Sequence, residues 1–172
     1  MSEEARRSSE ETALAPWLSR HSFNARVFFS GSLCGGSDYA ATPGQGQLHL
    51  VRRGPVRLLS AGGGPLLIEQ PSLILFTEPR GHRLQTDEQH GADLVCAQLS
   101  LDEADAGLLL LGFPACLVAR LDDLEGLGAI VNRLFDEAFS ENFAQQVAVD
   151  LLVELLMVML LRHCINRGLL AR

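Results

Sequence analysis

Residues 46–84 read GQLHLVRRGPVRLLSAGGGPLLIEQPSLILFTEPRGHRL and hold four short apolar runs separated by glycine and proline. The runs predict strands at Gln47–Arg52, Val56–Leu59, Leu66–Glu69 and Ser72–Phe76. The residues between them, Gly54-Pro55 and the AGGGP run at 61–65, are typical of turns because neither belongs in a strand interior. Short strands at this spacing favour a small antiparallel sandwich or barrel.

The flanking sequence extends this pattern on both sides. Ala25–Ser30 (ARVFFS) is rich in aromatic and β-branched residues and predicts a strand, and a glycine-rich loop follows to Gly46, with room for a short strand at Ser37–Ala41. Ala92–Ser100 (ADLVCAQLS) predicts the last strand. Its alternation places Leu94, Cys96 and Gln98 on one face and Val95, Ala97 and Leu99 on the other.

The hydrophobic period changes in the second half of the chain. Residues 101–112 predict a short helix that ends at Gly112 and Pro114. Apolar residues at 124, 127, 131, 134 and 138 alternate steps of three and four, which predicts a helix with one apolar side. At the other end of the chain, residues 1–9 predict a disordered tail and Glu10–Arg20 a short amphipathic helix.

The segment Phe143–Ile165 predicts a second helix with more than one apolar side. Its polar residues form a narrow stripe, and almost everything else from Val147 to Leu161 is apolar. Acidic residues at 150 and 154 interrupt the run too early for a membrane span, which needs about 20 apolar residues. We therefore expect one side to pack on the chain itself and another on a second copy, giving a homodimer. The residues assigned to that contact are Leu152, Leu155, Leu156 and Met159.

Length and composition limit the function. The 172 residues suffice for one sizeable core, and the net charge of −7 argues against binding nucleic acid without a further domain. The first twelve residues lack the apolar core of a signal peptide, and the four cysteines have no CxxC spacing. A cytoplasmic chain with reduced thiols and no membrane partner is expected.

The sequence contains neither a nucleophile elbow nor a phosphate-binding or dinucleotide-binding glycine motif. The remaining candidates are His49, His82 and Cys96, whose imidazole and thiol groups are good ligands for Zn or another divalent metal. Cys96 beside an imidazole is also a candidate redox thiol, and so is Cys34 in a glycine-rich loop. The alternative is that both histidines are hydrogen-bonded polar residues and Cys96 is a small core residue. No cofactor is fixed by the sequence.

The runs QLHLVRRGPVRLL, PSLILFTEPRGHRL and DLVCAQLS, taken together, resemble the cupin-type sensor domain at the N-terminus of AraC-type transcription regulators. The resemblance covers about residues 12–166 and includes SGSLCGG at 30–36. It implies a mainly β fold with C-terminal helices: a cupin-like β-barrel (jelly roll) over 10–100, then a helical pair for dimerisation over 101–166. It also implies a small-molecule or redox effector.

The sequence departs from enzymatic cupins, which carry a second histidine two residues after the first and then a glutamate. Val51 occupies the place of that histidine, and no acidic residue lies between Val51 and Glu69. We therefore expect a sensing and dimerising domain and no enzyme activity. Residues 167–172 are expected to begin a linker, with DNA contacted only through a following helix-turn-helix domain that the 172 residues lack. The alternatives are a small metal-dependent cupin enzyme using His49, His82 and Cys96, and an autonomous dimeric inhibitor acting through the helices.

Overall fold

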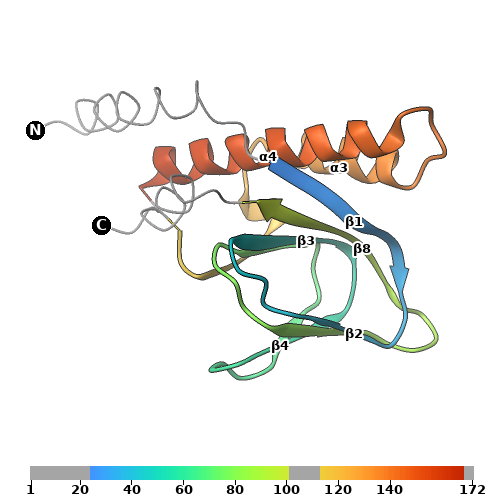
Figure 1. Cartoon of the computed structure of the whole chain (residues 1–172), viewed down its shortest axis with the longest axis vertical. Coiled ribbons are helices and arrows are strands. Elements are labelled where there is room, and N and C mark those ends of the chain that lie inside the picture. Colours follow the sequence, from blue (N-terminus) through green and yellow to red (C-terminus); the bar gives the residue numbers. More distant parts are fainter. Residues whose placement is uncertain (1–23, 101–112, 169–172) are drawn as a thin grey trace, which may run out of the picture.

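The structure is a computed structural model and describes residues 24–100 and 113–168. The predicted N-terminal tail, the predicted helices at 10–20 and 101–112, and residues 169–172 of the predicted linker lie outside the described residues. Within those ranges the chain forms two antiparallel sheets followed by two helices (Figure 1). The predicted class, mainly β with a C-terminal helical pair, is confirmed.

The two sheets divide the strands of the described residues between them. The five-stranded sheet has the order β1-β8-β3-β6-β9, and the four-stranded sheet has the order β2-β7-β4-β5. Every strand pairing is antiparallel. The strand bounds are β1 Asn24–Leu33, β2 Gly36–Tyr39, β3 Gln45–Arg53, β4 Val56–Ser60, β5 Leu66–Ile68, β6 Ser72–Phe76, β7 His82–Gln85, β8 Ala92–Ser100 and β9 Cys116–Arg120.

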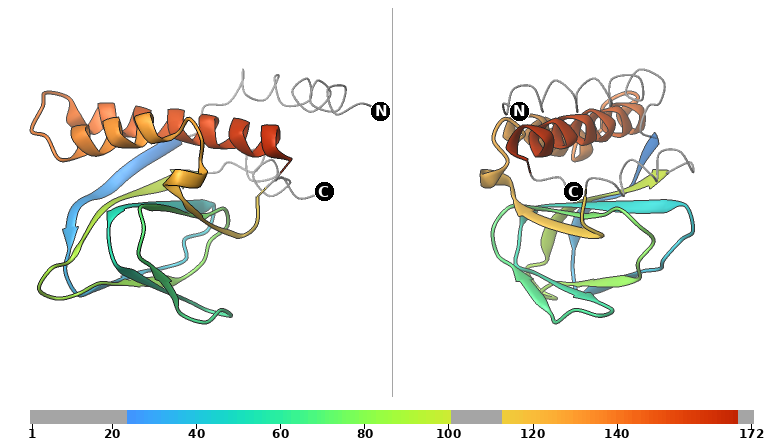
Figure 2. Two further views of the ribbon diagram at one scale, coloured as in Figure 1. Left: turned by 180° about the vertical axis from the view of Figure 1, so that it is seen from behind. Right: turned by 90° about the vertical axis from the view of Figure 1, so that its left-hand side faces the viewer.

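The five-stranded sheet is buried on both faces, because the other sheet covers its inner face and the helices cover its outer face (Figure 2). Leu48 and Leu50 of β3 belong to the outer core with the helices, whereas Val51 belongs to the inner core between the sheets. Strand β6 (SLILF) is buried at every position for the same reason. A strand buried on both faces loses the polar alternation of a half-exposed strand, which explains these continuous apolar runs.

The helices are α3, Gly128–Ala138, and α4, Gln145–Arg167, preceded by a short 3₁₀ turn η1, Leu121–Asp123. The predicted apolar side of α3 is buried through Val131, Leu134 and Ala138. Helix α4 ends at Gly168, whose φ of 63° is the left-handed conformation that glycine adopts without a steric penalty. Both helices lie across the outer face of the five-stranded sheet (Figure 1).

The polar stripe of α4 contacts the free edge of β1 and not solvent alone. The backbone N–H of Val27 donates to Asp150 Oδ1 at 2.7 Å, and that of Ala25 donates to Glu154 Oε1 at 3.2 Å. Gln146 Nε2 donates to the carbonyl oxygen of Val27 at 2.9 Å. Among the described strands β1 is the outermost of its sheet, so these side chains satisfy backbone groups that no described strand pairs.

Two strands were not predicted. The predicted strands of residues 46–84 end at Phe76, but His82 begins a further strand, β7, which pairs with both β2 and β4. The range 101–166 is predicted to be helical, but Cys116–Arg120 within it is β9, which pairs with β6. The sheet therefore continues past residue 100, and the helical part of the described chain begins only after Arg120.

Candidate functional site

The structure brings the two histidines into direct contact inside the barrel. His49 lies on β3 of one sheet and His82 at the start of β7 of the other. Their Nε2 atoms are 2.8 Å apart, and both side chains are buried, with 0% and 6% of their surface exposed. The pair therefore joins the two sheets by a hydrogen bond in an apolar interior.

A backbone carbonyl assigns the proton positions of this pair. His82 Nδ1 is 2.9 Å from the carbonyl oxygen of Arg80, which can only accept, so Nδ1 is the donor. In a neutral ring His82 Nε2 is then an acceptor, and His49 Nε2 donates to it. This leaves His49 Nδ1 as an acceptor, and it is buried without a hydrogen-bond partner.

Burial keeps both rings neutral. The pKa of His49 is lowered to about 3, first by burial and then by the neighbouring His82. Burial also lowers the pKa of His82, although its hydrogen bond to the Arg80 carbonyl acts in the opposite direction. The low dielectric of the interior disfavours the imidazolium form of each ring, so neither carries charge at neutral pH.

Two further rings enclose His82. The ring of Phe76 stacks on the His82 ring with centroids 4.1 Å apart. The ring of Tyr39 also stacks on the His82 ring, with centroids 5.0 Å apart. Tyr39 also meets His49 edge-on at 4.7 Å. Phe76 is buried, whereas Tyr39 on β2 is only partly buried. We name Tyr39, His49, Phe76 and His82 the ring cluster.

Cys96 lies beside the ring cluster, but as a protonated core residue. It pairs with His49 in the register of β3 and β8, and its Sγ is 3.9 Å from the Tyr39 hydroxyl. Burial raises the pKa of the Cys96 thiol to about 12. This raised pKa disfavours the thiolate that a redox thiol at Cys96 would use, because the neighbouring imidazole is neutral and the site is buried.

The residues of this site do not fit a metal. Metal-bound imidazoles direct their free nitrogens at a shared ion, but the Nε2 atoms of His49 and His82 are hydrogen-bonded to each other. The third candidate, Cys96, is next to the Tyr39 hydroxyl, with its Sγ 3.9 Å from that oxygen. Across 24–100 and 113–168, no group of three or more His, Cys, Asp and Glu side chains could hold a metal ion. The predicted Zn or divalent-metal site therefore finds no support among the described side chains.

Cys34 is exposed and separate from the ring cluster. It follows β1, which ends where Leu33 pairs with Ala92, four residues along β8 from Cys96. Four residues of extended strand span about 13 Å, so Cys34 and Cys96 do not form one site. Gly91 lies against this cysteine with φ +62°, and a Cβ there would come within 2.8 Å of the Cys34 Sγ.

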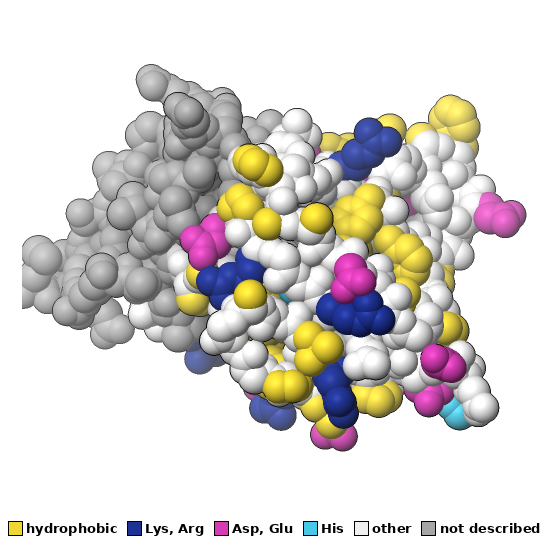
Figure 3. Space-filling model, turned by 60° about the horizontal axis from the view of Figure 1, so that its bottom comes forward, with side chains coloured by type: hydrophobic (Ala, Val, Ile, Leu, Met, Phe, Trp, Pro, Cys, Tyr) yellow, Lys and Arg dark blue, Asp and Glu magenta, His cyan; other side chains and the backbone are white. Residues whose placement is uncertain are grey.

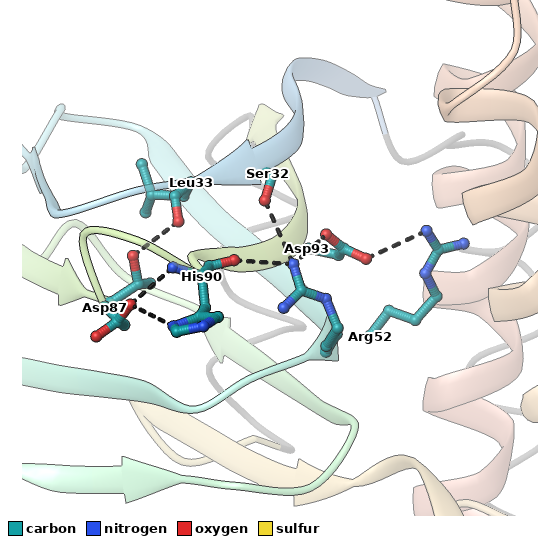
Figure 4. A network of polar contacts seen from close by, with 8 residues as sticks. Ser32, Leu33, Arg52, Asp87, His90 and Asp93 are labelled. Atoms are coloured by element: carbon teal, nitrogen blue, oxygen red, sulfur yellow. Dashed lines mark hydrogen bonds and ion pairs between the residues drawn. The ribbon is translucent and has the colours of Figure 1, made fainter.

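A polar network connects the rim of the barrel to helix α3 (Figure 4). Arg53 donates to Asp93 Oδ1 at 3.1 Å and to the carbonyl oxygen of His90 at 3.1 Å. Arg52 donates to the other carboxylate oxygen of Asp93 at 3.4 Å. Burial alone would raise the pKa of Asp93, but the two guanidinium groups outweigh it and lower that pKa. The guanidinium of Arg52 also lies over the rings of Phe135 and Phe139, 4.8 and 4.6 Å from their centroids.

Helix α4 divides the four residues predicted for the dimer contact. Leu155 is exposed at 49%, and Leu152 and Met159 are partly buried. Leu156 is fully buried in the core of its own chain, so its assignment to the contact is wrong. The exposed large apolar side chains of α4 and of the residues just before it follow a different line, which we name the outer stripe: Phe143, Val147, Leu151 and Leu155.

No helix among the described residues is both long enough and apolar enough to span a membrane. Asp150 and Glu154, which interrupt the apolar run of α4, are the side chains that bind the edge of β1.

Several solved structures resemble this chain at low sequence identity. ToxT from Vibrio cholerae O395 has a TM-score of 0.48 and 13% identity, covering 82% of this chain and 55% of that one. Wild-type ToxT from strain SCE256 bound to an unsaturated fatty acid has a TM-score of 0.48 and 12% identity, covering 87% and 56%. A DUF861 family protein from Thermotoga maritima has a TM-score of 0.30 and 14% identity, covering 55% and 90%.

The chain therefore spans about half of the ToxT chains that it matches. No curated protein matches it. The cupin family matches over residues 13–166, a range that contains every strand of both sheets, α3, all of α4 except Arg167, and the ring cluster. Because that match covers most of the 172 residues, the chain belongs to the cupin family.

Proposed function

We propose that this chain is the effector-sensing and dimerising domain of an AraC-type transcription regulator. The resemblance of residues 47–59, 71–84 and 93–100 to such sensor domains supports this function, and so does membership of the cupin family. Contact with DNA belongs to a helix-turn-helix domain that follows in the regulator. The effector is a small molecule that binds in the barrel interior beside the ring cluster.

The observation that carries this proposal is that one strand lies between the sensing interior and the helices. His49 and Val51 of β3 face the interior, while Leu48 and Leu50 of the same strand pack in the core formed with α3 and α4. Protein interiors are close-packed, so a displacement of β3 by a ligand is passed to the helices directly. A barrel wall shared with a dimerisation helix is suited to a ligand-dependent regulator.

The rim network supplies a second connection. Arg53 and Arg52 follow Val51 on β3, and Arg52 bridges Asp93 of β8 and the two phenylalanine rings at the end of α3. A guanidinium held between a carboxylate and aromatic faces has a defined position, so it links movement of β3 to α3.

Dimerisation is assigned to the outer stripe. Its four side chains are spaced four residues apart and remain between 49% and 101% exposed. Val147, Leu151 and Leu155 lie on α4, and Phe143 lies two residues before it begins. Large exposed apolar side chains gathered in this way mark an interaction surface. A second copy is the occupant we propose, because the same stripe on two antiparallel α4 helices gives a self-complementary contact with a twofold axis.

A fusion experiment tests both parts of this function. The chain is fused to a DNA-binding domain that represses a reporter only as a dimer, and repression is expected. The matched variants are Leu151→Glu, which should abolish repression, and the exposed Asp136→Ala on α3, which should not. A thermal-shift screen of small metabolites on the purified chain should identify a stabilising ligand. Full repression by the Leu151→Glu fusion, or metal-dependent turnover without any stabilising ligand, would contradict the proposal.

A further inference from the structure

His49 presents an unused hydrogen-bond acceptor in the barrel interior. Its Nδ1 is buried without a partner, while its Nε2 is committed to His82. A buried polar atom without a hydrogen bond destabilises the folded protein, so its presence in a core calls for an explanation. The hydrogen bonds from His82 to the Arg80 carbonyl and from His49 to His82 fix the tautomer of His49. Its Nδ1 can therefore accept a hydrogen bond but cannot donate one.

The surroundings of His49 select against charged ligands. The buried polar side chains of the described residues are His49, Ser72, Thr77, His82, Thr86 and Glu137, with no lysine or arginine among them. A carboxylate placed beside the ring cluster would lack a counter-ion, and a cation would meet only neutral rings in a site that disfavours charge. Apolar side chains make up the rest of this inner core.

Tyr39 separates the ring cluster from solvent. It is the one ring of the cluster that is partly exposed, and it lies on β2, a four-residue strand at the edge of the four-stranded sheet. Its hydroxyl makes a long contact of 3.9 Å with the Cys96 thiol. Moving this ring exposes the faces of both His49 and His82, because it contacts each of them.

This inference rests on the proposed function and defines the chemistry of its effector. We propose that the effector is an uncharged molecule carrying a ring and a hydrogen-bond donor, a hydroxyl or an N–H. The ring takes the place of the Tyr39 ring against His82, and the donor bonds to Nδ1 of His49. Unlike the tyrosine, a ligand is free of the backbone and can turn its donor towards this atom.

The test uses phenol, its methyl ether anisole and benzoate as probes on the full chain. Phenol has a ring and a donor, anisole keeps the ring without the donor, and benzoate replaces the donor with a charge. Phenol is expected to bind at least about tenfold more tightly than anisole by calorimetry, the ratio that one good hydrogen bond gives. Benzoate is expected to bind most weakly. The ¹⁵N signal of His49 Nδ1 should shift with phenol and remain unchanged with anisole.

Two variants assign the effect to the named atoms. His49→Leu should bring the phenol-to-anisole ratio to about one, and Tyr39→Ala should tighten the binding of both probes by removing the competing ring. The exposed His90→Leu is the matched control and should keep the ratio of the unmodified chain. If His49→Leu does not fold, the Nδ1 signal of the unmodified chain still decides the question.

Equal affinity for phenol and anisole would overturn the inference, and so would preferential binding of benzoate. The inference would also be overturned if the Nδ1 signal of the free chain already has the shift of a hydrogen-bonded nitrogen and phenol does not change it. That result would mean that a bound water alone occupies the position. A screening ligand that perturbs the signals of His82 and Phe76 but binds equally well to His49→Leu would refute the donor chemistry. That last result would leave the sensor function standing.

Discussion

At the scale of single residues, a hydrogen bond between their Nε2 atoms couples His49 to His82. His82 has partners on both nitrogens, whereas His49 has one. We predict that His82→Leu destabilises the chain by about 1–3 kcal/mol, because it leaves both His49 nitrogens buried without partners. The double variant with His49→Leu should recover part of this loss. Urea denaturation measures both values, and strictly additive losses would show that the two rings are not coupled.

The neutral state of His49 gives a pH dependence of defined sign. Its pKa falls from 6.5 to about 3 on folding, so the unfolded chain takes up a proton in a pH range where the folded chain does not. Its contribution to stability is complete above pH 6.5 and is lost as the pH falls towards 3, by up to about 1.4 kcal/mol per unit. Stability should therefore decline less steeply between pH 7 and pH 5 in His49→Leu than in the unmodified chain. Parallel declines in the two proteins would contradict the low pKa of His49.

At the scale of elements, α4 has three distinct sides: a buried apolar side, a polar stripe on β1, and the outer stripe. Asp150→Ala should destabilise the chain by about 1–3 kcal/mol and accelerate hydrogen exchange at the Val27 amide, which loses its acceptor. Asp136→Ala on the exposed side of α3 is the control, with an expected change within about 0.5 kcal/mol. An unchanged exchange rate at Val27 would show that Asp150 does not protect the strand edge.

At the scale of the whole molecule, substitutions at two neighbouring leucines of α4 should have different effects: one should change assembly and the other should change stability. Leu155→Glu is predicted to give a folded monomer in sedimentation, because it places a charge within the proposed contact between copies. Leu156→Ala is predicted to lower stability by about 2–5 kcal/mol, because this side chain is fully buried in its own chain. A Leu155→Glu protein that remains dimeric would place the interface elsewhere.

Binding to DNA should be weak and non-specific for this chain alone. The net charge is −7, and the face shown in Figure 3 intersperses basic, acidic and apolar side chains with no continuous basic surface. Phosphate binding depends on clustered lysine and arginine and weakens with salt. We expect any retardation of duplex DNA by the 172 residues to disappear at modest salt in a gel-shift titration. Retention that depends on sequence and survives salt would contradict this.

The sequence alone determined much of the sheet architecture, because the relevant signals are local. Strands β6 and β8 begin and end as predicted, since alternation, proline and glycine act over a few residues. The two predicted faces of β8 are confirmed, with Leu94 and Cys96 inside the barrel and Val95, Ala97 and Leu99 towards the helices. Residues on each of these two faces recur every second position, as the geometry of a strand requires.

The tertiary structure decided what depends on pairing between distant residues. Strand β7 is four residues long, and β9 owes its place to register with β6 about forty residues earlier, so neither gives a strong local signal. The polar stripe of α4 has the pattern of a solvated face, yet it satisfies the edge of a strand more than a hundred residues away. The metal and thiol hypotheses for His49, His82 and Cys96 depend on tertiary structure in the same way. Proximity was predicted correctly, but protonation and partners depend on burial and on the Arg80 carbonyl, which only the folded chain brings to His82.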